Sequence, residues 1–305
     1  MALTVVGSIA FDSVRTPFGE RERMLGGSAV HFALAASFFT EVMVVGSVGE
    51  DFGEEHIEAL RSRGVDTSDV ERVPGETFFW RGHYDADLNI AHTDETRLGV
   101  FADFEPKLSD GSREAEALFL GNIQPDLQRR VRAQCDGARL AALDSMNLWI
   151  KTTREALQAA IAEVDCVILN DAEIRMLTEE PNLARAAREL MGTGPRIVVA
   201  KRGEYGAALF TGHGFYALPG LLLEDVRDPT GAGDSFAGGF LGYLDGCGAF
   251  DPDDRTLHRA MAYGTVLASF NVEEFGTERV ARLSADEVSE RYADLRALTH
   301  FDVPD

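Results

Sequence analysis

Short apolar runs alternate with amphipathic stretches from one end of the chain to the other. This is the pattern of a parallel β-sheet covered by helices on both faces. The apolar runs are bounded by polar residues or glycine, and they predict core strands at residues 3–6, 42–45, 117–120, 140–143, 166–169 and 197–200. Helical periodicity predicts helices at residues 28–39, 54–63, 126–134, 153–162, 183–191, 234–244, 255–270 and 285–298. The sequence therefore predicts an α/β fold, with a doubly wound, mostly parallel sheet flanked by helices, in a single domain spanning residues 1–305.

Two segments, at about residues 12–25 and 76–95, interrupt this rhythm and read as strands exposed on one face. In the second, residues 77–84 and 88–93 flank the polar turn Asp85-Ala86-Asp87, which predicts a hairpin. Together the two segments would form a small β lid that excludes water from a reaction site. A hairpin that packs against a sheet edge or forms a dimer interface is the other reading, and the two are compatible.

The composition excludes several classes of function. The net charge of −22 would repel nucleic acid and anionic membranes. No apolar run approaches ~18 residues and the N-terminal segment lacks a basic flank, so we expect a cytoplasmic protein. The three cysteines form no metal-like or redox pair. The strong acidity with only three lysines suits either a high-salt environment or an arginine-preferring genome, and it requires local positive potential wherever a polyphosphate binds.

The densest chemistry lies in residues 228–239, where small residues and two carboxylates open an apolar helix. Gly231, Ala232 and Gly233 have almost no side chain, so their N–H groups can approach an anion at the helix N-terminus. The negative charge of Asp234 would destabilise a bound polyphosphate by repulsion. A carboxylate at this position therefore indicates a chemical role, such as accepting a proton from an attacking hydroxyl. The segment therefore predicts phosphoryl transfer.

Other readings of this segment are an ordinary helix N-cap by Asp228 or Thr230 and a dinucleotide-binding glycine turn. The second is disfavoured because the preceding residues 221–227 end in charge instead of forming a buried strand. A Walker-type loop is excluded, since neither Gly-Lys-Ser nor Gly-Lys-Thr occurs in the chain.

The segment Asp228-Pro229-Thr230-Gly231-Ala232-Gly233-Asp234 resembles the C-terminal signature of the ribokinase-like sugar kinases, also called PfkB carbohydrate kinases. The resemblance extends over nearly all of the chain. It implies a ribokinase-like fold, an anion hole at Gly231, Ala232 and Gly233, and Asp234 as the catalytic base.

Near the N-terminus, Gly7-Ser8-Ile9-Ala10-Phe11-Asp12 and Gly26-Gly27-Ser28-Ala29-Val30-His31 are similar to two further motifs of this family. They imply that Asp12 holds substrate hydroxyls and that Gly26 and Gly27 let the substrate approach the backbone. His31 stands where many members have an asparagine that touches the substrate; it would bind substrate or be structural. Only 13 residues separate Asp12 from Gly26. That interval is short for the family's lid strands and makes a lid-mediated dimer doubtful, although a homodimer stays possible.

The middle of the chain resembles the nucleotide side of the family's site. Asn170-Asp171-Ala172-Glu173 is similar to the Asn-x-x-Glu motif, which implies that Asn170 and Glu173 organise Mg²⁺ and its waters near the phosphates of ATP. Without the family, the same two residues read as a helix capping box. Lys201 and Gly203 lie in a segment similar to the Thr-x-Gly-x-x-Gly nucleotide motif, with lysine where threonine is usual. Lys201 would contact a donor phosphate or pair with Glu204.

The resemblance also implies roles at the edge of the nucleotide site. Asn271 and Gly276 lie in a segment that resembles the loop bordering the adenine pocket, which helps to hold a monovalent cation. By the same analogy the backbone carbonyls of Asp228 and Thr230 would join a K⁺ site. Asn147 or Trp149 follows a predicted strand and would line the acceptor pocket.

We therefore expect an ATP-dependent kinase that transfers the γ-phosphate to a hydroxyl of a sugar or sugar-containing small molecule. A nucleoside kinase of the same fold is the alternative, because the aromatic lid residues Phe78, Phe79, Trp80 and Tyr84 would stack on a base or else serve the hairpin's own packing. A catalytically inactive nucleotide-binding regulator and a dehydrogenase are further alternatives.

Overall fold

A nine-stranded sheet runs through the centre of the computed structural model, which describes residues 2–300. Along the sheet the order is β13 (Gly214–Leu218), β12 (Ala207–Thr211), β11 (Ile197–Lys201), β10 (Cys166–Asn170), β9 (Leu140–Leu143), β8 (Ala117–Leu120), β1 (Ala2–Val6), β4 (Glu41–Val48) and β5 (Asp66–Arg72). The seven strands from β11 to β5 are parallel, while β12 and β13 are antiparallel additions at one edge. The predicted doubly wound, mostly parallel sheet is confirmed.

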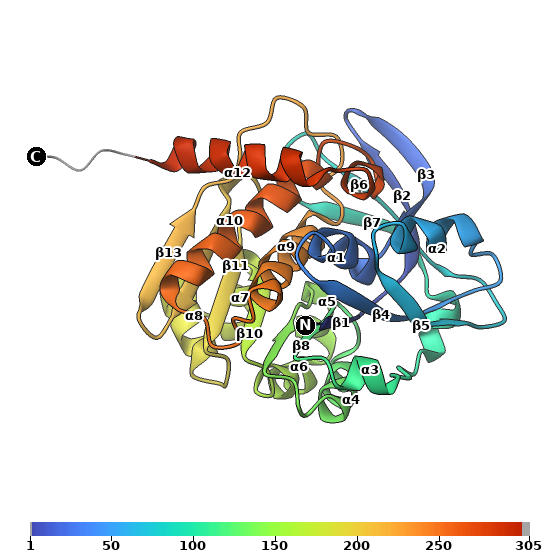
Figure 1. Ribbon diagram of the computed structural model, residues 1–305, viewed down its shortest axis with the longest axis horizontal. Helices are drawn as coiled ribbons and strands as arrows, with labels where there is room; N and C mark the ends of the chain where they lie inside the picture. The colour runs from blue at the N-terminus through green and yellow to red at the C-terminus, as the bar shows by residue number, and fades with distance from the viewer. Residues whose placement is uncertain (1, 301–305) are drawn as a thin grey trace, which may run out of the picture.

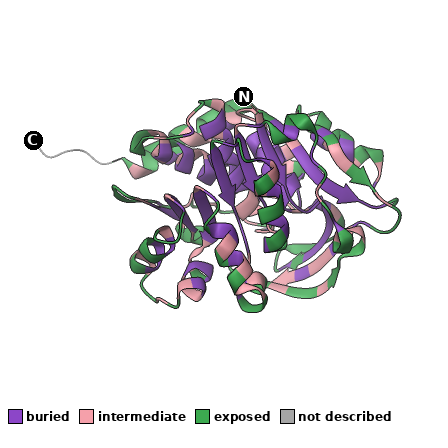
Figure 2. Ribbon diagram, turned by 90° about the horizontal axis from the view of Figure 1, so that it is seen from below, coloured by how far each residue is buried: buried purple, intermediate pink, exposed green. Residues whose placement is uncertain are grey.

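Helices cover both faces of this sheet, and the buried strands lie between two helical layers (Figures 1 and 2). One layer contains α1 (Ser28–Ala36), α2 (Glu54–Arg61), α9 (Ala232–Gly246), α10 (Asp254–Asn271), α11 (Glu278–Ala281) and α12 (Ala285–Thr299). The other contains α4 (Pro125–Gln134), α5 (Asn147–Thr152), α6 (Arg154–Ile161), α7 (Asp171–Thr178) and α8 (Leu183–Met191). Short helices η1 (Gly99–Asp103), α3 (Asp110–Arg113) and η2 (Gly203–Tyr205) lie in connections. Neighbouring strand residues such as Val198 and Val199 alternate between the two cores, as a sheet buried on both faces requires.

A second sheet of four strands stands beside the main one and contains both segments that interrupt the sequence pattern. Its order is β3 (Gly19–Gly26), β2 (Ala10–Thr16), β6 (Phe78–Tyr84) and β7 (Ala91–Arg97). The predicted hairpin is present as the antiparallel pair β6–β7, and β2 joins it by parallel pairing with β6. The short interval between Asp12 and Gly26 thus accommodates most of two paired strands. We call this second sheet the lid.

The strand order reverses between β1 and β8, because β1 continues to β4 on one side while β8, β9, β10 and β11 follow on the other. Open α/β sheets bind ligands at the carboxyl ends of the strands beside such a reversal. Gly7 and Gly121 directly follow β1 and β8 there, and both lie so close to Ser28 that a side chain at either position would collide with its hydroxyl. No helix within residues 2–300 is long and apolar enough to span a membrane.

Candidate active site

The turn before α9 leaves the backbone N–H groups of Gly231 and Gly233 without an acceptor among residues 2–300. Gly231 is the N-cap of α9 and has a left-handed backbone with φ of 76°, which a glycine adopts without strain. The N–H of Ala232 donates to the carbonyl of Pro229 at 3.2 Å, so it closes the turn instead of remaining available as expected from the sequence. The N–H of Gly233 has no acceptor among the described residues. The N–H of Gly233 at the N-terminus of α9 is therefore available to donate to an anion.

A buried hydrogen-bond network holds this turn from behind. Oδ1 of Asn271 accepts from Nδ1 of His31 at 2.9 Å and from the hydroxyl of Ser235 at 3.0 Å, while Nδ2 of Asn271 donates to the carbonyl of Thr230 at 2.7 Å. The imidazole of His31 also fills the space where a side chain on Gly231 would lie, 2.3 Å from the ring. Asn271 is fully buried, so it supports the turn from inside the protein.

His31 is neutral and keeps one unused acceptor. Burial lowers its pKa to about 4, although the hydrogen bond to Asn271 opposes the shift. Because Asn271 offers an oxygen, the proton is assigned to Nδ1, and Nε2 is left as a lone-pair acceptor. Nε2 is buried and has no hydrogen-bond partner among residues 2–300. An unsatisfied buried nitrogen is costly, so it indicates a missing hydroxyl or amine donor.

Asp12 is held by the two glycines of the N-terminal motif. A side chain on Gly26 would begin 2.0 Å from Oδ2 of Asp12, and Gly27 has φ of 96° with no room for a side chain beside the carbonyl of Ser8. The backbone of Gly27 hydrogen-bonds the carboxylate. Burial raises the pKa of Asp12 to about 7, and the negative charges of Asp228 and Asp234 add to this effect. The N-terminal motif therefore brings Asp12 close to Asp228 and Asp234, at the turn before α9.

Acidic and basic side chains meet at the carboxyl ends of β9, β10 and β11. Nζ of Lys201 donates to Oδ2 of Asp144 at 2.7 Å, and the same ammonium group lies 2.8 Å from the place of a side chain on Gly233. Burial disfavours the charge of Lys201, but Asp144, Glu173 and Asp234 outweigh it and raise the pKa of the lysine. Lys201 pairs with Asp144 and not with Glu204, the partner considered from the sequence.

Asp234 lies in the first turn of α9 and is partly exposed. Its surroundings nevertheless disfavour its charge: burial and the negative charge of Asp144 raise its pKa to about 7, against the opposing effect of Lys201. A carboxylate that titrates near neutral pH is suited to accept a proton from a hydroxyl.

Asn170 and Glu173 form the capping box that their spacing permits. Oδ1 of Asn170 accepts from the N–H of Glu173 at 2.7 Å, and Oε2 of Glu173 accepts from the N–H of Asn170 at 2.9 Å. Burial raises the pKa of Glu173 to about 7, and Asp144 adds to the shift. The second oxygen of Glu173 accepts no hydrogen bond from residues 2–300.

The same residues fit a hydrated divalent cation. Within the described chain no group of three or more acidic, histidine or cysteine side chains could hold a metal ion directly. Asp144, Glu173 and Asp234 together outnumber the single cation Lys201, so a polyphosphate would meet excess negative charge. A Mg²⁺ ion that keeps most of its waters and binds chiefly to phosphates would offset that charge.

Asp228 fastens the turn to the loop after α10. Its fully buried carboxylate accepts from the N–H of Thr230 at 2.9 Å and from the N–H of Gly276 at 3.1 Å. Burial raises its pKa, which these hydrogen bonds partly offset. The carbonyl of Thr230 already accepts one hydrogen bond from Asn271, and a carbonyl oxygen retains a second lone pair.

The lid contacts both ends of the site. The hydroxyl of Tyr84, at the end of β6, lies 3.2 Å from the hydroxyl of Thr230, and Oδ1 of Asn89 lies 2.8 Å from the place of a side chain on Gly203. Gly203 is exposed, with a left-handed φ of 56°. The hairpin β6–β7 and its loop therefore reach from the turn before α9 to the loop after β11.

Of the four lid aromatics, three share a face with Asp12: Phe78, Trp80 and Tyr84. Trp80 is the register partner of Asp12 in the parallel pair β2–β6, and neighbours in register project from the same face of a sheet. The indole of Trp80 lies across Gly82, and Tyr84 follows on the same face. Phe79 is buried in the core, and Phe78 stacks on Phe101 with ring centroids 5.4 Å apart.

The structure leaves Asn147 at the exposed start of α5, with no hydrogen bond from its side chain to residues 2–300. Trp149 donates to Asn122 at 2.9 Å. Sequence reasoning gave no role to Asp144 and Ser235, which contact Lys201 and Asn271. For Asp144 the sequence did contain a signal, because a residue that directly follows strand β9 lies at the carboxyl edge of the sheet, where ligands bind.

Comparison with known proteins identifies a family. Residues 107–282 match the model described as pfkB family carbohydrate kinase. A cytidine kinase of Thermococcus kodakarensis is 33% identical over 252 residues, which cover 80% of this chain and 89% of the relative. An ATP-dependent ribose-1-phosphate kinase of Halopiger xanaduensis is 30% identical, over 82% of this chain and 87% of the relative. The solved nucleoside kinase of Methanocaldococcus jannaschii, described as an archaeal member of the ribokinase family, superimposes with a TM-score of 0.77 at 21% identity, covering 96% of this chain and 98% of that one.

Proposed function

The chain belongs to the pfkB family of carbohydrate kinases and is an ATP-dependent phosphotransferase with an alcohol acceptor; we propose that Asp234 is its catalytic base and that the acceptor hydroxyl belongs to the sugar of a nucleoside. The proposal that Asp234 is the base rests on the arrangement at the start of α9. There Asp234, with a pKa near 7, lies beside the unpaired N–H of Gly233 and the ammonium group of Lys201.

In this proposal each residue has a separate task. Asp12, whose pKa is raised in part by the negative charge of Asp234, orients the acceptor hydroxyl, and Nε2 of His31 accepts a hydrogen bond from a second donor on the acceptor. Asp234 takes the proton as the hydroxyl attacks, while the N–H of Gly233 and the charge of Lys201 stabilise the transferring phosphoryl group. Mg²⁺ supplies charge neutralisation on the donor phosphates, and Asn170 and Glu173 would hold it through water. The lid excludes water from the reaction.

Replacing Asp234 with asparagine tests the base. Asparagine keeps the size of the side chain but cannot accept the proton, so turnover should fall by about 10²–10⁴-fold, the usual range for removal of a general base. Circular dichroism and ATP binding should stay close to wild type. An Asp136→Asn variant changes an exposed carboxylate and serves as the control. Near-normal turnover in Asp234→Asn would remove Asp234 as base.

Trp80 supports a nucleoside over a free sugar. Trp80 is paired with Asp12 in the sheet register, and its partly exposed indole lies across Gly82 and donates to the hydroxyl of Thr93 at 3.1 Å, where a base attached to a bound ribose would find an aromatic face. The cytidine kinase at 33% identity agrees with this choice. Stacking of a base on an aromatic ring is worth about 1–3 kcal/mol.

A panel of sugars and nucleosides with coupled detection of ADP tests the acceptor. We expect nucleosides to give the highest kcat/KM. Trp80→Ala should lower kcat/KM for a nucleoside by about tenfold or more while changing that for free ribose little. Equal loss for both acceptors would contradict stacking. No ADP production with any acceptor would favour a regulator without catalysis.

A further inference from the structure

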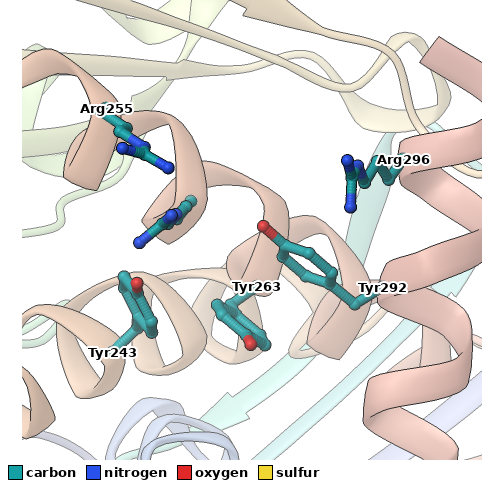
Figure 3. A pocket seen from close by; sticks show the side chains of 6 residues that line it. Tyr243, Arg255, Tyr263, Tyr292 and Arg296 are labelled. Carbon is teal, nitrogen blue, oxygen red and sulfur yellow. The ribbon is translucent and has the colours of Figure 1, made fainter. Parts of the chain in front are cut away.

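A second cavity, near the C-terminal half of α9, is lined by positively charged side chains that have no role in the proposed reaction. Three arginines and three tyrosines line a cavity of about 460 Å³ between α9, α10 and α12: Tyr243, Arg255, Arg259, Tyr263, Tyr292 and Arg296. Figure 3 shows Tyr243 and Arg255 on one side, Tyr292 and Arg296 on α12 on the other, and Tyr263 between them. Asp234 and Tyr243 are nine positions apart on α9, which is about 14 Å along a helix. A ligand in this cavity is therefore distinct from one at the catalytic turn.

The arginines of this cavity have no carboxylate within 4.0 Å in the described part of the chain, whereas most arginines of the protein do. Among residues 2–300, fifteen arginines form ion pairs within 4.0 Å. Arg255, Arg259 and Arg296 form none with residues 2–300, and Arg259 hydrogen-bonds the hydroxyl of Tyr243. Asp253 is the acidic neighbour of Arg255 and Arg259, but its carboxylate caps α10 by accepting from Thr256 at 2.8 Å. In a protein of net charge −22, three guanidinium groups around one cavity without a carboxylate of the described chain within 4.0 Å produce a local positive potential that favours an anion.

The aromatic side of the cavity is built as a rigid stack. The rings of Tyr243 and Tyr263 lie 4.7 Å apart and those of Tyr263 and Tyr292 4.5 Å apart, measured between centroids. Phe39 supports Tyr263 at 4.9 Å from the protein side. A fixed wall of tyrosines beside free guanidinium groups suits a ligand with an anionic end and a larger body. The cavity volume lies in the range of small-molecule pockets and exceeds what inorganic phosphate fills.

We propose that this cavity binds a phosphorylated small molecule of nucleotide or sugar-phosphate size, with its phosphate on Arg255, Arg259 and Arg296. Guanidinium groups match phosphate oxygens in charge and geometry, and the tyrosine hydroxyls provide additional donors. The site requires no property of the catalytic turn, so it does not depend on the proposed base or acceptor.

Isothermal titration of the full chain at low salt tests the proposal, with inorganic pyrophosphate, AMP and ribose 5-phosphate as probes. The informative variant is Arg255→Ala with Arg296→Ala, because both side chains are exposed and the bond between Arg259 and Tyr243 remains. Arg188→Ala, an exposed arginine on α8 without a carboxylate partner among residues 2–300, is the matched control. Both variants keep the catalytic turn, so binding there cancels in the comparison.

We expect wild type and Arg188→Ala to bind at least one probe with equal affinity, and the double variant to lose about tenfold in affinity for each guanidinium removed. Tighter binding of AMP would identify a nucleotide as the ligand, and tighter binding of ribose 5-phosphate a sugar phosphate; each upholds the site. Identical isotherms in all three proteins would overturn it. A second result would also overturn the proposal. If sedimentation without any added anion showed dimers of wild type and Arg188→Ala but only monomers of the double variant, the arginines would serve a protein interface.

Discussion

Nζ of Lys201 lies 2.7 Å from Oδ2 of Asp144, and the same ammonium group stands against Gly233 in the turn that begins α9. The pair joins the carboxyl ends of β11 and β9 across β10. It places one positive charge among three carboxylates, those of Asp144, Glu173 and Asp234. The charge state of Asp234 therefore depends on both members of the pair.

The first prediction concerns Asp144→Asn. Because the negative charge of Asp144 raises the pKa of Asp234 and Lys201 lowers it, removal of that charge while the lysine remains should lower the pKa of Asp234 below its value of about 7. Asp234 must be ionised to accept a proton, so the acidic limb of the pH profile of kcat/KM should move to lower pH. Rates between pH 5 and 8 measure this limb. An unmoved limb would show that another group controls it, and Asp136→Asn on the surface should leave it in place.

The second prediction compares two glycines of the same turn. In Gly231→Ala the new methyl group would lie 2.3 Å from the His31 ring on a left-handed backbone, so both the ring and the turn must shift. The backbone conformation alone costs about 1–2 kcal/mol. In Gly233→Ala the methyl meets only the flexible end of Lys201 at 2.8 Å. Urea denaturation should show a clear loss of stability for Gly231→Ala. Gly233→Ala should keep its stability but lose turnover, and the reverse order would contradict this geometry.

How far the sequence predicted the structure depended on burial. Strands β8 and β9 and helix α8 were predicted with the bounds that the structure has, because each is apolar or strongly amphipathic and clearly punctuated. Strand β5 was missed because its residues, Asp66–Arg72, are mostly charged or polar at a sheet edge, where charge prevents unwanted pairing. The hairpin β12–β13 was missed as well, although Gly212 and Gly214 mark its turn.

The site was predictable where chemistry is local in the sequence and not where it depends on topology. The turn around Gly233 and Asp234 and the capping box of Asn170 and Glu173 follow from adjacent residues. The partner of Lys201 does not, because 57 positions separate it from Asp144 and only the strand order brings them together.

The third prediction concerns the stability of the Asp234→Asn variant. The pKa of Asp234 is raised from its ordinary value of 3.8 to about 7, so the folded state binds this proton more tightly than the unfolded state. The stabilisation is fully present below pH 4 and is lost as the pH rises to about 7. Asparagine carries no charge to bury, so the variant should be more stable than wild type at pH 8, by a margin that shrinks towards pH 4. Urea denaturation at several pH values measures the difference in stability between the variant and wild type. A difference that favours the variant less at pH 8 than at pH 5 would contradict the prediction.

The last prediction separates general charge screening from a specific K⁺ site. A net charge of −22 produces self-repulsion that salt screens, so the free energy of unfolding should rise with ionic strength equally in NaCl and KCl. A cation bound by the carbonyls of Asp228 and Thr230 would act on the catalytic turn, since Thr230 joins it to Asn271 and to Tyr84. Turnover should then rise in KCl and not in NaCl, and it should saturate at concentrations too low for screening. Above that range, the free energy of unfolding should depend on salt concentration in the same way in KCl and in NaCl. Equal turnover in both salts at every concentration would leave screening as the complete explanation and exclude a role for K⁺ in catalysis.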